Sequence, residues 1–166
     1  MFKYINLLKY VMSIGDEHNL EIKNTIIIDA STEVVFKAIT EPEELTQWFP
    51  DQAILVPKIG GKVRFVTLKE IHPEWKLDRD YISEGTIKEF VPNKKLSYTW
   101  IVLDTPDFPE TTVVWELEEI GPNKTKVELT HLGFTGKEKG LTSIESHNEG
   151  WTDLMSKLAK YCTVEE

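Results

Sequence analysis

The feature that most constrains the fold is a helical pattern near the C-terminus, in residues 142–162 (TSIESHNEGWTDLMSKLAKYC). Its apolar side chains recur at the spacing of a helix with one apolar face. They are Trp151, Leu154, Met155, Leu158, Ala159 and Cys162. Thr142 and Glu145 have the spacing of a capping box, which predicts the start of the helix. We expect such a helix to lie against a sheet.

Gly150 interrupts this helical pattern. A glycine inside a helix costs about 1 kcal/mol relative to alanine. Its presence therefore indicates either close approach of another backbone or room left for something else. The helix either only covers a sheet or also forms one wall of a cavity.

Alternating apolar and polar residues predict a long β region before this helix. The expected strands are 20–29, 53–57, 62–68, 81–90, 95–102, 111–120 and 125–132. Two short helices are expected after the first strand, one capped by Ser31 and one by Thr40 with Glu43 as its capping-box partner. Residues 69–80 are polar and are expected to form an irregular loop, and residues 133–141 a flexible link.

The order of these elements predicts an α+β fold. An antiparallel sheet with one apolar face must cover that face, and the C-terminal helix is the one long amphipathic element available. We therefore expect a curved antiparallel sheet of about six or seven strands wrapped around that helix, with the two short helices closing one end. This domain is expected to span residues 20–166, after an N-terminal extension of residues 1–19.

The extension MFKYINLLKYVMSIG is expected to form a short amphipathic helix ending near Gly15. Lys9 interrupts its apolar run and no small-residue cleavage site follows, which argues against a signal peptide. An alternative is that translation begins at Met12. The chain has no apolar run long enough for a transmembrane helix.

Charge and cysteine content restrict the partners and the compartment. The chain has 166 residues, enough for one domain, with 28 acidic against 19 basic residues and a net charge of −9. This balance argues against nucleic acid or an anionic membrane surface as partner. A single cysteine, Cys162, excludes an internal disulfide and predicts a cytoplasmic protein. Its place on the apolar stripe indicates a buried, inert thiol.

Large side chains on the predicted inner faces are the candidate lining of a ligand cavity. They are Trp48, Phe49, Tyr98, Trp100, Trp115, His131, Trp151 and Met155. Aromatic walls with a few polar tips are typical of small-molecule sites. The alternative is that these side chains simply fill the core.

Titratable residues give weaker signals for chemistry. His131 is the one histidine predicted on an inner face, either as a general acid or base or as a structural histidine. On a helix, His147 points away from Glu145 and Glu149, each two residues from it, so the three are interpreted as a solvated helix start rather than as metal ligands. His72, Glu74, Asp78 and Asp80 lack a ligand spacing. No metal, cofactor or catalytic motif is predicted.

Four segments resemble one family. They are STEVVFKAITEPEELTQWF (31–49), GTIKEFVPNKKLSYTW (85–100), TTVVWELEEIGPNKTKVELTHLGF (111–134) and EGWTDLMSKLAKY (149–161). In this order they are similar to the family named for the C-terminal domain of the activator of the heat-shock-protein-90 ATPase, in the START-like (SRPBCC) superfamily. The resemblance runs from about Leu20 to the C-terminus and implies the helix-grip fold.

The resemblance implies three functional hypotheses. Superfamily members bind lipids, sterols, polyketides and other hydrophobic molecules between the sheet and the long helix, so the first is a small-molecule binding protein without a cofactor. A minority are cyclases or hydrolases, so the second is an enzyme with His131 as acid or base. The third is a stress-related protein that contacts a chaperone. A monomer and a homodimer both remain open.

Overall fold

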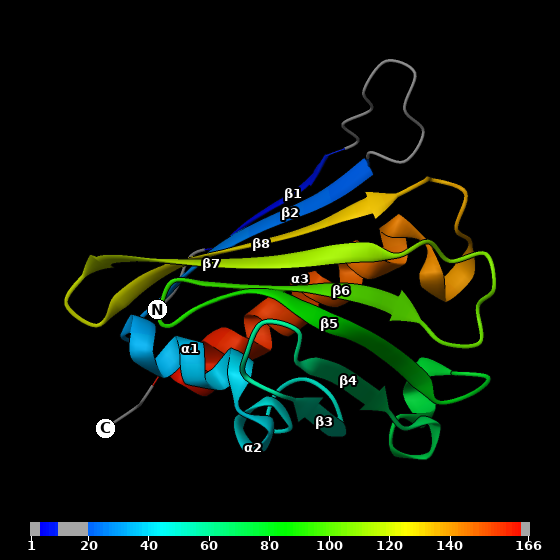
Figure 1. The fold of residues 1–166 in the computed structure, drawn as a ribbon, viewed down its shortest axis with the longest axis horizontal. Coiled ribbons are helices and arrows are strands. Elements are labelled where there is room, and N and C mark those ends of the chain that lie inside the picture. Colours follow the sequence, from blue (N-terminus) through cyan, green and yellow to red (C-terminus); the bar gives the residue numbers. More distant parts are fainter. Residues whose placement is uncertain (1–3, 10–19, 164–166) are drawn as a thin grey trace.

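The computed structural model describes residues 4–9 and 20–163 of the chain. Within them, eight antiparallel strands form one curved sheet in the order β1-β2-β8-β7-β6-β5-β4-β3, and the long helix α3 crosses one face of it (Figure 1). The strands are β1 (Tyr4–Lys9), β2 (Leu20–Ile28), β3 (Gln52–Leu55), β4 (Lys62–Thr67), β5 (Tyr81–Val91), β6 (Lys95–Val102), β7 (Thr111–Gly121) and β8 (Lys124–Phe134). The helices are α1 (Thr32–Thr40), α2 (Pro42–Leu45) and α3 (Ile144–Cys162). The predicted α+β, helix-grip fold is confirmed.

Apolar side chains recur at every second position along the strands, and this alternation gives the sheet one buried face. In β2 every second side chain is buried, including Asn24, the polar residue within its apolar series. Val127, Leu129 and His131 of β8 are fully buried in the same way. Because β7 and β8 pair in register, with Val113 opposite His131, the buried faces of neighbouring strands join into one surface that faces α3.

Helix α3 buries the predicted stripe, but it begins one residue later than the capping box suggested. The Ser143 hydroxyl, not that of Thr142, caps the helix by accepting from the Ser146 N–H at 3.1 Å. Thr142 belongs to a short 3-10 turn, Gly140–Thr142, and its hydroxyl donates to the Lys139 carbonyl. The two hydroxyl residues are adjacent, and Ser143 has the extended backbone of a cap.

The two short helices close one end of the sheet, as predicted. Ser31 caps α1 by accepting from the Val34 N–H at 3.2 Å. The expected cap at Thr40 is wrong: this residue ends α1, and its hydroxyl donates to the Phe36 carbonyl at 2.6 Å. Helix α2 instead begins at Pro42 without a side-chain cap.

The helix expected in residues 1–19 is wrong wherever the structure describes that segment. Residues Tyr4–Lys9 form β1, which pairs antiparallel with β2 and adds an eighth strand at the sheet edge. The expected helix end at Gly15 and the alternative start at Met12 lie outside the described residues. Among the described helices, none is long and apolar enough to cross a membrane.

Candidate functional site

A cavity of about 460 Å³ lies between the sheet and the N-terminal half of α3. Strands β4, β5 and β6 supply one wall, and residues 146–154 of α3 supply another. The lining residues are Phe49, Phe65, Thr67, Trp75, Leu77, Tyr81, Ser83, Trp100, Leu141, Ser146, His147, Glu149, Gly150, Trp151, Asp153 and Leu154. Trp75 and Leu141 are exposed, so the cavity opens to solvent on their side. Its volume falls within the range of small-molecule sites, about 300–1,000 Å³.

Three of the eight residues predicted to line a cavity do line this one: Phe49, Trp100 and Trp151. They come from the chain after α2, from β6 and from α3. The Phe49 and Trp100 rings are nearly parallel, with 6.5 Å between their centroids, and the Trp100 and Trp151 centroids are 5.5 Å apart. The three rings therefore form one continuous aromatic wall.

The other predicted residues pack deeper, in the core beside the cavity. They are Trp48, Tyr98, Trp115, His131 and Met155, all 5 % exposed or less. Their polar atoms are paired: Trp115 Nε1–H donates to the Tyr98 hydroxyl at 3.1 Å and Trp48 Nε1–H to the Ala38 carbonyl at 2.9 Å. The Trp115 ring meets Trp151 edge-on, so these side chains support the cavity wall from behind.

His131 joins the sheet to α3 through a fully paired ring. Trp151 Nε1–H donates to His131 Nδ1 at 3.0 Å, so that nitrogen carries the lone pair and the proton is on Nε2. Nε2–H then donates to Thr111 Oγ1 at 2.7 Å, and the Thr111 hydroxyl donates to the Trp100 carbonyl at 2.8 Å. Burial, with nearby His147 as a smaller cause, holds the pKa of His131 well below its usual range. Both ring nitrogens are engaged by the protein, which favours the structural interpretation of His131 over general acid–base catalysis.

His147 lines the cavity and is buried. Its Nδ1–H donates to the Ser143 carbonyl at 3.0 Å, which leaves Nε2 as an acceptor for the Tyr81 hydroxyl, also at 3.0 Å. Burial lowers the pKa of His147 to about 4, against smaller opposing effects led by the Ser143 hydrogen bond. At neutral pH the ring is therefore uncharged. Burial also raises the pKa of Tyr81, so its proton stays on the oxygen.

The indole N–H of Trp100 is buried and lies next to the Tyr81 hydroxyl. No acceptor among the described residues meets hydrogen-bond geometry with Nε1. The N–H does act on the Tyr81 hydroxyl, whose pKa it lowers against the larger effect of burial. The two groups are therefore neighbours in the same cavity wall.

Gly150 borders the cavity. Its surroundings decide whether another backbone approaches this glycine closely or whether the missing side chain leaves open space. An added Cβ atom would meet nothing within 4 Å. No backbone approaches closely there, so the glycine leaves open space along the cavity side of α3.

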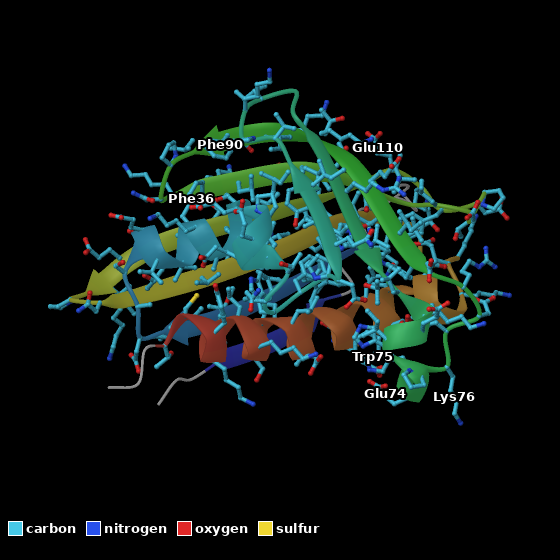
Figure 2. All side chains as sticks on the ribbon, turned by 90° about the horizontal axis from the view of Figure 1, so that it is seen from below. Phe36, Glu74, Trp75, Lys76, Phe90 and Glu110 are labelled. Carbon is cyan, nitrogen blue, oxygen red and sulfur yellow. The ribbon has the colours of Figure 1, made fainter. Side chains whose placement is uncertain are left out.

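Residues 69–80 lie over one side of the cavity through Trp75 and Leu77. The expected irregular loop contains two short 3-10 turns, Lys69–Ile71 and Pro73–Trp75. Trp75 stacks on His72, with ring centroids 3.9 Å apart, and the Lys157 ammonium lies 5.5 Å from the Trp75 ring centroid. His72 Nε2 in turn lies 3.0 Å from the Asp51 carboxylate. Figure 2 shows Trp75 beside the orange, N-terminal part of α3.

Among the described residues, the histidines and carboxylates are not arranged as the ligands of a metal ion would be. In the part of the chain that the structure describes, no three His, Cys, Asp or Glu side chains are grouped closely enough to hold a metal ion. Cys162 is buried, and burial raises the pKa of its thiol to about 12.

The sequence interpretation missed His147, although a signal was present. It was assigned to a solvated helix start, which is wrong for this residue. The buried stripe of α3 continues backward from Trp151 to His147 and Ile144 at intervals of four and three residues. Extending the helical period by one turn would have placed His147 on the inner face. No comparable signal marks Trp75, because its position depends on how residues 69–80 fold over the sheet.

Comparison with known proteins decides the family. The sequence model described as "Activator of Hsp90 ATPase homolog 1-like protein" matches residues 29–163. The chain belongs to this family. The resemblance seen in the four segments is thereby confirmed, within the START-like superfamily. No curated protein shows significant similarity to the chain.

Solved structures share the fold of this Hsp90-activator-like chain at low sequence identity. A Chromobacterium violaceum protein is 17 % identical with a TM-score of 0.74, covering 87 % of this chain and 98 % of its own. The Aha1 dimer from Colwellia psychrerythraea is 19 % identical with a TM-score of 0.67, covering 87 % and 97 %. An HSP90 activator from Plasmodium falciparum is 23 % identical with a TM-score of 0.64, covering 85 % and 93 %.

Proposed function

We propose that this protein binds a small apolar or aromatic molecule in the cavity between β4–β6 and α3. The observation that carries the proposal is a solvent-connected space of about 460 Å³ with aromatic walls. Phe49, Trp100 and Trp151 supply ring surface, while Tyr81 and His147 supply uncharged polar groups. Apolar walls with few converging polar groups are the usual architecture of small-molecule sites.

The aromatic wall is held in place before any ligand arrives. Trp151 is fixed by its hydrogen bond to His131, and the Trp100 backbone by Thr111. His147 is fixed between the Ser143 carbonyl and the Tyr81 hydroxyl. Because these side chains do not have to be ordered on binding, less of the interaction free energy is lost as conformational entropy.

Native mass spectrometry and thermal unfolding test this proposal together. We expect the protein purified without denaturation to carry a non-covalent small molecule, or a panel of neutral aromatic compounds to contain stabilisers. A compound present at 100 times its dissociation constant should add about 2.7 kcal/mol to the free energy of unfolding. For a domain of this size that corresponds to a midpoint shift of roughly 5–10 °C. An empty native spectrum together with no stabilising compound would count against the proposal.

A second candidate function is contact with an Hsp90 chaperone. It is supported by the family description, and one structural neighbour is titled an HSP90 activator. The test is the ATPase rate of Hsp90 from the same organism with and without this protein. A concentration-dependent rise would support the candidate, and an unchanged rate would remove it.

A further inference from the structure

We infer that Ser83 determines which ligand this cavity accepts: its hydroxyl forms a hydrogen bond with a hydroxyl group on a ring compound, an alcohol or a phenol. The inference rests on the proposed binding function and narrows its ligand class. It is carried by a buried hydroxyl that faces the cavity and has no partner in the described part of the protein.

Ser83 lies on β5, in the sheet wall of the cavity. Its neighbours across the sheet are Phe65 of β4 and Val102 of β6, which are buried apolar side chains. Ser83 itself is 2 % exposed. A hydroxyl in such a place is normally hydrogen-bonded, because its removal from water is otherwise unfavourable.

The hydroxyl of Ser83 is left open by the protein. Among the described residues, no donor or acceptor meets hydrogen-bond geometry with its Oγ. Unlike Trp100 Nε1, which is sealed from solvent, this oxygen keeps accessible surface where Ser83 lines the cavity. A serine hydroxyl can both donate and accept, and a ligand hydroxyl can match both roles. A hydrocarbon in the same place leaves the serine unpaired.

The neighbouring hydroxyls indicate where the ligand group lies. Tyr81 does not compete for it, because its hydroxyl already donates to His147 Nε2 at 3.0 Å. Thr67 of β4 pairs with Tyr81 and is therefore the diagonal neighbour of Ser83, and it also lines the cavity. A ligand group at Ser83 thus lies near the Thr67 side chain, between β4 and β5.

The charges around the cavity favour an uncharged group at this position. Among the lining residues in the described part of the chain, none is a lysine or an arginine, and the two carboxylates, Glu149 and Asp153, belong to α3. His147 supplies no positive charge at neutral pH, since burial lowers its pKa to about 4. An ionised carboxylate on the ligand would lose hydration at Ser83 without gaining a counter-charge.

Two ligands of similar shape test the inference: 2-naphthalenemethanol and 2-ethylnaphthalene, in which a hydroxyl and a methyl group replace each other. Displacement of Nile red at pH 7.5 gives their affinities for wild type and for Ser83→Ala. The alcohol should bind Ser83→Ala about 3- to 10-fold more weakly than wild type, as expected for the loss of one hydrogen bond. The ethyl compound should bind both proteins about equally. Comparing each ligand across the two proteins cancels the difference in hydrophobicity between the ligands.

Ser97→Ala is the matched control. Ser97 is also 2 % exposed, but it lies on β6 and does not line the cavity. This variant should bind both ligands like wild type. Thermal unfolding adds a second measurement for Ser83→Ala: because the substitution removes a hydroxyl without a partner, the unfolding midpoint should stay the same or rise.

The outcomes distinguish this inference from the proposed function. If Ser83→Ala leaves the affinity of the alcohol unchanged, or weakens both ligands by the same factor, the role of Ser83 is wrong, but a binding cavity stands. A clearly lower unfolding midpoint would show that the hydroxyl is paired inside the protein, which also overturns the inference. If neither compound displaces Nile red from wild type, the inference fails, and an empty native spectrum would then remove the binding function too.

Discussion

At the scale of single residues, the two buried histidines show how position decides what a side chain does. His131 is surrounded by Trp151, Thr111 and the sheet, and both of its nitrogens are used to hold those groups. His147 is one layer closer to solvent, at the cavity, where it orients Tyr81. Burial keeps both rings uncharged, so they position aromatic and hydroxyl groups without adding charge to the cavity.

The low pKa of His147 makes a prediction about pH. In the unfolded chain the residue titrates near pH 6.5, and in the folded protein near pH 4. Between these values the unfolded chain binds more protons, so the free energy of unfolding falls as the pH is lowered, by about 1.4 kcal/mol per pH unit for one histidine. The stabilising contribution is complete above pH 6.5.

The measurement is chemical unfolding of wild type and His147→Gln between pH 7 and pH 4.5. Glutamine can still accept the Tyr81 hydroxyl proton but does not titrate. The variant should lose stability less steeply as the pH is lowered. Parallel curves would mean that His147 is protonated equally in both states.

At the scale of elements, α3 combines structural support with a share of the cavity. Its stripe from Met155 to Cys162 is buried in the core, whereas its N-terminal half faces the cavity. The change occurs near Gly150, the residue whose missing side chain leaves space. Alanine at this position would favour the helix without meeting any neighbour, because the space beside Gly150 is open.

Gly150→Ala should therefore stabilise the protein. The added Cβ meets nothing within 4 Å, and alanine is about 0.8–1 kcal/mol more favourable than glycine in a helix. The unfolding midpoint should rise by about 2–4 °C. Gly85→Ala is the opposing control, because its Cβ would lie 1.7 Å from the Thr99 carbonyl oxygen. The account of α3 is wrong if Gly150→Ala lowers the midpoint.

At the scale of the whole molecule, the sequence predicted the sheet and the long helix because both follow from local periodicity. Alternation located seven strands, and the helical stripe located α3. Strand β1 was not predicted, because it pairs with β2 across residues 10–19 and its short sequence also fits a helix. The partner of an edge strand is a long-range property that a local pattern does not contain.

The aromatic inner face was predicted, but its division into core and cavity was not. Trp100 and Trp115 have the same alternation in neighbouring strands, yet one borders the cavity and the other is packed behind it. The difference depends on how completely side chains from several elements fill the volume beside each ring. His147 and Tyr81 complete the site through a contact 66 residues apart in sequence.

The central claim is that the space beside α3 holds a ligand. Its most direct test measures the affinity of a neutral fluorescent probe, Nile red, for wild type and for two variants at Gly150. Gly150→Leu adds a side chain that extends into the cavity, while Gly150→Ala changes the helix in the same way without filling it. The account predicts that the alanine variant binds the probe like wild type and that the leucine variant binds it at least about 10-fold more weakly, with both folded. Equal binding by the two variants would contradict it.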